Sequence, residues 1–175
     1  MSNSVCWTTL LHVLCMLGGE EMVRLAIAKY GPGNSYPTDA ALLYDHYRYT
    51  PLWRAAEAGS VGVLKLLIEA GADPAERIEG NPISALGIAI QKGHTAATEY
   101  LIDAGAAVTP SSNVQPFFTP LVQIVRAGNL HLLNRLLDVG GAPDEDALHS
   151  ALLLASDSTN NVAIARRLLE AGARL

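Results

Sequence analysis

The stretch TPLWRAAEAGSVGVLKLLIEAGADP, residues 50–74, decides the fold of this chain. Thr50 can accept hydrogen bonds from the free amide groups at the start of a helix, and Pro51 suits the first helical turn. Gly59 stands nine residues after Thr50, where a glycine lets the backbone adopt a positive φ angle and turn back. The apolar residues that follow have helical spacing: Val63, Leu64, Leu67 and Ile68. The stretch therefore predicts two short helices joined by a tight turn.

The same pattern recurs along the chain at intervals of 41, 34, 35 and 31 residues. The units open at Thr9, Thr50, Ser84, Thr119 and Ser150. The glycine nine residues later is Gly18, Gly59, Gly93 or Gly128, and the last unit has Thr159-Asn160-Asn161 in its place. The glycines that close the units are Gly31, Gly71, Gly105, Gly140 and Gly172. Because a helix pair of this size cannot bury its apolar face alone, neighbouring units must stack on one shared core.

These observations predict an all-α solenoid of about five helix-turn-helix units. A chain of 175 residues, half of them hydrophobic, has enough apolar surface for one self-standing domain, so a single domain over residues 1–175 is expected. The approximate unit boundaries are 9–49, 50–83, 84–118, 119–149 and 150–175.

Several of the repeated motifs resemble the ankyrin repeat. They are Thr-Pro-Leu at 50–52 and 119–121, Ala55-Ala56, Gly93-His94 and Glu-Ala-Gly-Ala-Asp-Pro at 69–74. The resemblance extends over residues 8–175. It implies an ankyrin-repeat solenoid with finger-like junction loops, in which fingers and first helices line a concave groove that binds a protein. It also implies that His94 forms a hydrogen bond between repeats.

Composition and charge exclude several classes of partner. Twelve Lys and Arg residues against 17 Asp and Glu give a formal charge of −5, opposite to what a phosphate backbone requires. The chain has no run of 18 apolar residues that could span a membrane, and Met1 to Ser4 offers no basic start of a signal peptide. Cys6 and Cys15 fit reduced thiols. We therefore expect a cytoplasmic protein with neither a nucleic-acid nor a membrane partner.

The sequence contains no convincing catalytic or metal-binding motif. No histidines or cysteines have the close spacing of a zinc site, and neither a Gly-x-Ser-x-Gly elbow nor a phosphate-binding glycine loop occurs. We expect no metal, no cofactor and no enzymatic activity. The alternative is a hydrolase-type enzyme built on a degenerate repeat, in which Asp45 and His46 act near Ser35 or Thr38.

The junction before Thr50 is several residues longer than a regular one and contains four tyrosines, Tyr36, Tyr44, Tyr47 and Tyr49. Tyrosine and tryptophan offer a large contact area at modest entropy cost and are enriched among interface hot spots. Trp53 stands where ankyrin repeats commonly have histidine, and we expect it to anchor a partner from the groove. The alternative for Tyr44 and Tyr49 is that they pack the long loop onto the neighbouring helix.

The groove mapping and the enlarged junctions together give a predicted partner-binding surface. Its residues are Tyr44, His46, Tyr47, Tyr49, Trp53, Glu57, Gln91, Lys92, Phe117 and Arg126. Phe117 and Phe118 either extend this surface or seal their hairpin against the stack. If Tyr47 and Trp53 do not contribute, the next place to expect the partner is the acidic junction from Asp144 to Asp146.

The two end units are expected to differ in polarity. The N-terminal helix is apolar around most of its circumference, with Leu10, Leu11, Val13, Leu14, Met16 and Leu17. Such a patch predicts that self-association, a partner, or Val5 to Trp7 covers this end. Arg166, Arg167 and Glu170 predict a charged outer face at the C-terminal end.

The resemblance, together with the variation among units at groove positions, predicts a non-catalytic protein-binding module. Because the sequence has almost nothing outside its repeats, we expect the protein to act by occupying its partner. We therefore favour a stoichiometric inhibitor, an immunity-like protein or a regulatory protein over a multi-partner scaffold.

Overall fold

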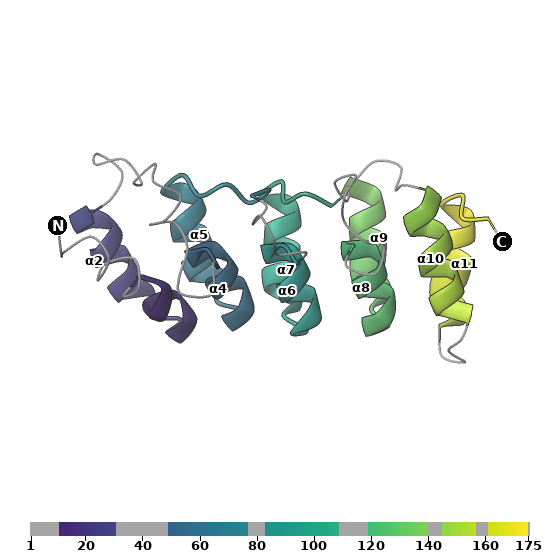
Figure 1. The fold of residues 1–175 in the computed structure, drawn as a ribbon, viewed down its shortest axis with the longest axis horizontal. Coiled ribbons are helices and arrows are strands. Elements are labelled where there is room, and N and C mark those ends of the chain that lie inside the picture. Colours follow the sequence, from purple (N-terminus) through teal and green to yellow (C-terminus); the bar gives the residue numbers. More distant parts are fainter. Residues whose placement is uncertain are drawn as a thin grey trace.

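A computed structural model describes residues 11–30, 49–76, 83–108, 119–139, 145–156 and 161–174. Every regular element in these ranges is a helix, and the helices stand side by side in one row from the N-terminus to the C-terminus (Figure 1). Residues 11–17 are helical. The labelled helices are α2 (Glu20–Tyr30), α4 (Pro51–Ala58), α5 (Val61–Glu69), α6 (Ala85–Gln91), α7 (Thr95–Asp103), α8 (Pro120–Ala127), α9 (Leu130–Val139), α10 (Glu145–Ser156) and α11 (Val162–Glu170).

The predicted openings of the middle units are confirmed as helix caps. The hydroxyl of Thr50 accepts a hydrogen bond from the amide of Trp53 at 3.1 Å, and Ser84 and Thr119 cap α6 and α8 in the same way. Gly59 and Gly128 end α4 and α8 with φ angles of 71° and 68°. Their left-handed backbone turns the chain back toward the second helix, as predicted.

The last unit departs from the predicted pattern. Helix α10 begins at Glu145, so Ser150 lies inside the helix instead of capping its start. Glu145 and Asp146 occupy the first turn, where the helix dipole favours negative charge. The prediction that these two residues belong to a junction loop is therefore wrong, and Asp144 lies outside the described residues.

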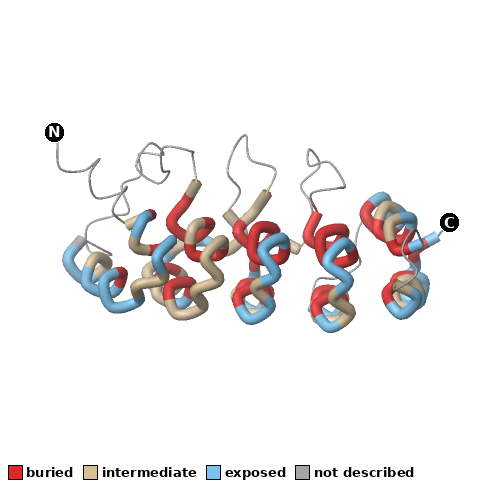
Figure 2. The backbone as a smooth tube through the Cα atoms, turned by 90° about the horizontal axis from the view of Figure 1, so that it is seen from below, coloured by how far each residue is buried: buried red, intermediate tan, exposed pale blue. Residues whose placement is uncertain are grey.

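The helices form two layers that share one core. The first helices of successive units, α4, α6, α8 and α10, pack against one another, and so do the second helices α2, α5, α7, α9 and α11. Buried apolar residues form a single cluster that extends from Cys15 to Ala173. Figure 2 shows these buried stretches recurring from unit to unit, as expected for a solenoid.

Side-chain hydrogen bonds to backbone carbonyls join consecutive units. His12 Nε2 donates to the carbonyl of Tyr49 at 2.8 Å, and Trp53 Nε1 donates to the carbonyl of Ile83 at 3.1 Å. His12 and Trp53 are each the third residue after a unit opening, and each acceptor directly precedes the next opening. The tryptophan thus makes the same link that histidine makes one unit earlier.

Polar pairs also connect the second helices. Asp103 on α7 pairs with Arg135 on α9 at 2.5 Å. Arg167 on α11 reaches back to Asn134 and Asp138 on α9, at 2.9 and 3.4 Å. Exposed pairs of this kind contribute little stability individually, but they fix the register of neighbouring units.

The C-terminal end is less polar than predicted. Arg167 contacts the preceding unit, and three large apolar side chains at this end are exposed: Leu153, Val162 and Leu169. The expected charged outer face is therefore wrong in part, although Arg166 and Glu170 are exposed. No helix among the described residues has the length and apolar character needed to cross a membrane.

Candidate functional site

The structure describes six of the predicted partner-binding residues: Tyr49, Trp53, Glu57, Gln91, Lys92 and Arg126. Tyr44, His46, Tyr47 and Phe117 lie outside the described residues. The groups of the hydrolase alternative, which are Ser35, Thr38, Asp45 and His46, lie outside them as well. The candidate site is therefore built from the first helices and the turns that follow them.

A row of side chains that are not buried runs along the first helices, at the seventh and eighth positions after each unit opening. We call it the first-helix face. It consists of Met16, Leu17, Glu57, Gln91, Lys92 and Arg126. Because the units stack in register, these positions of neighbouring units lie close together, and Lys92 Nζ is 3.7 Å from Glu57 Oε1 of the preceding unit.

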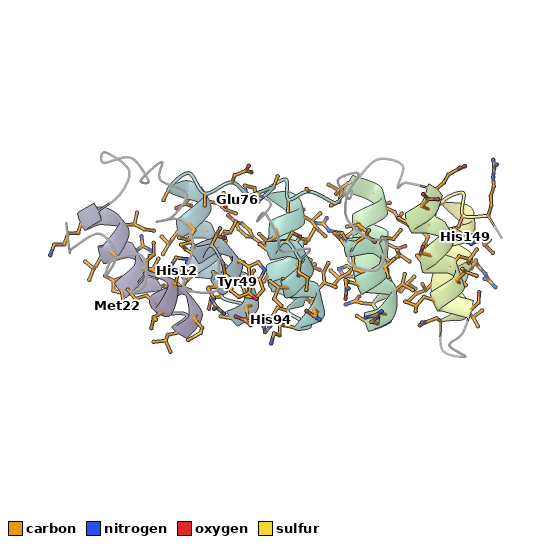
Figure 3. All side chains as sticks on the ribbon, viewed as in Figure 1. His12, Met22, Tyr49, Glu76, His94 and His149 are labelled. Carbon is orange, nitrogen blue, oxygen red and sulfur yellow. The ribbon has the colours of Figure 1, made fainter. Side chains whose placement is uncertain are left out.

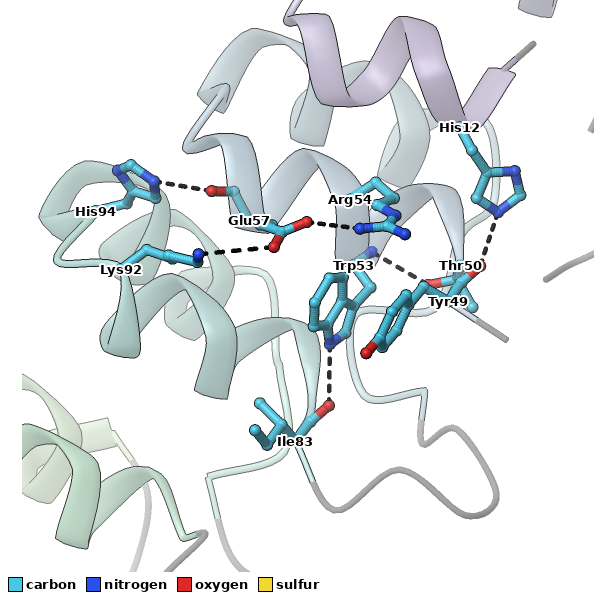
Figure 4. A network of polar contacts seen from close by, with 9 residues as sticks. All are labelled: His12, Tyr49, Thr50, Trp53, Arg54, Glu57, Ile83, Lys92 and His94. Carbon is cyan, nitrogen blue, oxygen red and sulfur yellow. Dashed lines mark hydrogen bonds and ion pairs between the residues drawn. The ribbon is translucent and has the colours of Figure 1, made fainter. Parts of the chain in front are cut away.

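Glu57 is the centre of a polar network on this face (Figure 4). Arg54 Nη1 donates to Glu57 Oε2 at 2.8 Å, and Lys92 approaches the other carboxylate oxygen. His94 Nε2 donates to the backbone carbonyl of Glu57 at 3.0 Å, which confirms the predicted hydrogen bond between repeats. Because these contacts come from two units, they hold the charged groups of α4 in place before a partner arrives.

An aromatic stack lies beside the network. The rings of Tyr49 and Trp53 are 3.9 Å apart and nearly parallel, and the Arg54 guanidinium lies 4.6 Å from the centroid of the Tyr49 ring. Tyr49 is only partly exposed and packs against the core. This arrangement favours the alternative in which Tyr49 packs its loop onto the neighbouring helix.

The position of Trp53 corrects the expectation of an exposed anchor. Only 5% of Trp53 is accessible, and its indole N–H is already used by the carbonyl of Ile83. Trp53 is therefore a positioning residue that supports Tyr49, Arg54 and the start of the next unit.

The first-helix face is basic although the chain is acidic. On the described part of this surface, Lys92 and Arg126 outnumber the one acidic residue, Glu57, and Arg54 lies beside it on α4. Its N-terminal end is apolar, since Met16 and Leu17 are both exposed. Sequence reasoning missed Arg54 as part of the site, although its spacing of three residues from Glu57 on one helix was a usable indication.

The described residues offer no cluster of three or more His, Cys, Asp or Glu side chains that could hold a metal ion. Burial raises the pKa of Glu76, and the charge of Asp73 raises it further. These two carboxylates lie at the turn after α5, away from the first-helix face.

Cys15 is buried in the core, and desolvation raises the pKa of its thiol from 9.0 to about 12. With Cys6→Ser removing the other thiol, native protein at pH 8 is expected to react with a thiol reagent roughly 10³-fold more slowly than unfolded protein, because only the thiolate reacts. Burial of the neutral thiol makes its full contribution to the stability of the folded state below pH 9. This contribution to stability is lost as the pH rises toward 12. The rate is measured from the absorbance of the coloured thiolate that a disulfide reagent releases when it reacts with Cys15. Equal rates in native and denaturing buffer would contradict the burial of Cys15.

Comparisons with known proteins agree with this architecture. A family model described as "Ankyrin repeats (3 copies)" matches residues 2–78. Among solved structures, the human ASB11 ankyrin repeat domain matches with a TM-score of 0.68 and 22% sequence identity, covering 94% of this chain and 69% of that one. A search of curated proteins found no match. The family model matches the first units, and the solved structure shows that the chain as a whole has the ankyrin-repeat fold.

Proposed function

We propose that this protein is a non-catalytic binding module that occupies a single protein partner as a stoichiometric inhibitor, an immunity-like protein or a regulatory protein. Ankyrin repeats support protein binding in general. The observation that carries the proposal is the first-helix face, where Glu57 and Lys92 are held in position by a contact between two units. A buried, reduced Cys15 also suits the cytoplasm, where we place the protein.

The chemistry of the face defines the kind of partner. Its two basic residues against a single carboxylate favour an acidic segment, while Met16 and Leu17 offer contact area to an apolar side chain at one end. Complementary charge of this kind increases the rate of association and the specificity more than the affinity itself. Binding should therefore weaken as salt is added.

Reversing the basic charges of the face tests the proposal. The double variant Lys92→Glu/Arg126→Glu is expected to bind the partner at least about tenfold more weakly, because like charges would then face each other across the interface. The matched control is Lys65→Glu/Arg166→Glu, which changes the net charge equally but on the second helices α5 and α11.

The experiment captures the partner from the native cell on the immobilised protein and then measures the affinity of both variants by calorimetry. A single partner bound one to one, weakened only by the first-helix variant, supports the proposal. Many weak partners would favour the scaffold alternative. Equal affinity of the two variants would remove the first-helix face from the interface.

A further inference from the structure

Both ends of the helix stack expose large apolar side chains at positions that are buried or half-buried in the inner units. At the N-terminal end, Met22 and Leu25 on α2 are each 54% exposed. At the C-terminal end, Leu153 on α10 and Leu169 on α11 are each 50% exposed. Figure 3 places Met22 at the N-terminal end of the row and His149, on α10, at the opposite end.

The N-terminal pair occupies positions that face a preceding unit. Met22 is the fourth residue after the turn glycine Gly18, and every later unit buries the equivalent residue: Val63, Ala97, Leu132 and Ile164. Leu25 corresponds to Arg135 and Arg167, which both reach back to the unit before them. Among the described residues no unit precedes α2, so Met22 lacks the neighbour that covers its equivalents.

The C-terminal pair occupies positions that face a following unit. Leu153 is the third residue after Ser150 and corresponds to His12, Trp53 and Val122, all of which are buried. His12 and Trp53 also bond to the unit that follows them. Leu169 stands three residues before Gly172 and corresponds to Ile102, which is buried, and to Ile68 and Leu137, which are half-buried against the core.

The two ends thus carry the two matching halves of the interface that the chain repeats internally. We propose that the C-terminal face of one copy, Leu153 and Leu169, stacks on the N-terminal face of a second copy, Met22 and Leu25. A second copy is the occupant that the structure specifies, because it presents the complementary half in the same geometry as each internal junction. Such a head-to-tail contact is heterologous, so each dimer still has one free face of each kind and further copies can add.

The C-terminal end also keeps a charged position of the internal junctions. Asp103 and Asp138 each stand two residues before a closing glycine, and each pairs with an arginine of the next unit. Glu170 has the same place in the last unit, is exposed, and has no ion pair with any described residue. At the other end, Leu25 has the place of Arg135 and Arg167, and Arg24 beside it pairs with Glu21 on α2 itself at 3.8 Å. The C-terminal end therefore keeps a carboxylate at the position from which inner units bond to the next unit.

The test uses two variants that each block one face, Met22→Asp/Leu25→Asp and Leu153→Asp/Leu169→Asp. Because all four side chains are exposed, folding should be unaffected, and far-UV circular dichroism checks this. Wild-type protein is expected to grow in mass as its concentration rises to about 1 mM, where even weak contacts become populated. Each variant alone should remain a monomer, whereas an equimolar mixture should form a dimer and stop there, since the mixture keeps one intact face of each kind.

Val139→Asp is the matched control, because Val139 is equally exposed but lies at the end of α9, inside the row. It should associate like the wild type. A wild-type protein that stays monomeric, as it would if residues 1–10 covered α2, overturns the proposal. So does a variant that still dimerises alone, which would indicate a symmetric contact. Sedimentation velocity resolves all of these species, and binding through the first-helix face should be unchanged in every variant.

Discussion

Replacing Trp53 by alanine is expected to lower the free energy of unfolding by about 3–5 kcal/mol, the range for removing a buried tryptophan. The indole ring fills the space between two units, stacks on Tyr49 and donates a hydrogen bond to Ile83. Its removal would leave a cavity at a junction and would free the start of α6. Urea denaturation followed by far-UV circular dichroism measures the loss.

Trp53→Phe separates the ring from its hydrogen bond. Phenylalanine keeps an aromatic surface for Tyr49 but cannot donate to the carbonyl of Ile83. We therefore expect a smaller loss of stability than with alanine, and about 1 kcal/mol of the loss with phenylalanine should come from the hydrogen bond. If alanine at this position cost less than about 0.5 kcal/mol, the value typical of a surface change, Trp53 would not be a packed junction residue.

Gly59→Ala is expected to destabilise the protein by about 2–3 kcal/mol. Gly59 has a φ angle of 71°, which costs an alanine roughly 1–2 kcal/mol. An added Cβ would also lie 2.5 Å from Nδ1 of His94, so the ring must move and its hydrogen bond to the Glu57 carbonyl, worth about 1 kcal/mol, would be lost.

Gly128→Ala is the matched control for this effect. Gly128 ends α8 with almost the same φ angle, 68°, but the nearest atom to its added Cβ is 3.7 Å away, an ordinary contact. It should therefore show only the backbone cost. Equal losses in the two variants, measured by thermal and urea unfolding, would mean that the link through His94 adds no stability.

Much of the fold was predictable because its local rules repeat. A hydroxyl cap, a proline in the first turn and a glycine with positive φ each act within a few residues, so Thr50, Pro51 and Gly59 predict their own structure. The rule failed at Ser150. There Glu145 and Asp146 stabilise an earlier start of α10, and the helix runs through the expected cap.

The site was harder to predict, because burial depends on neighbours that are distant in sequence. From sequence alone, an aromatic residue beside a long junction can be either a binding anchor or a packing residue. For Trp53 the structure decides for packing, because the indole N–H donates to the carbonyl of Ile83, 30 residues away in sequence. In the same way, Arg167 resembles a solvated end residue until α9 brings Asn134 within 2.9 Å. Lys92 and Glu57 were predicted on the same face, and the contact between them joins two units of the stack.

The most direct measurement for the binding surface is amine labelling of the protein with and without its partner. The chain has three lysines: Lys29, Lys65 and Lys92. Only Lys92 lies on the first-helix face, whereas Lys65 is exposed on α5 and Lys29 stands at the end of α2. Mass spectrometry after a brief pulse of an amine-reactive reagent should show that the partner protects Lys92 and leaves Lys65 unchanged. Protection of Lys65 with Lys92 fully reactive would place the partner on the second helices and contradict the proposed function.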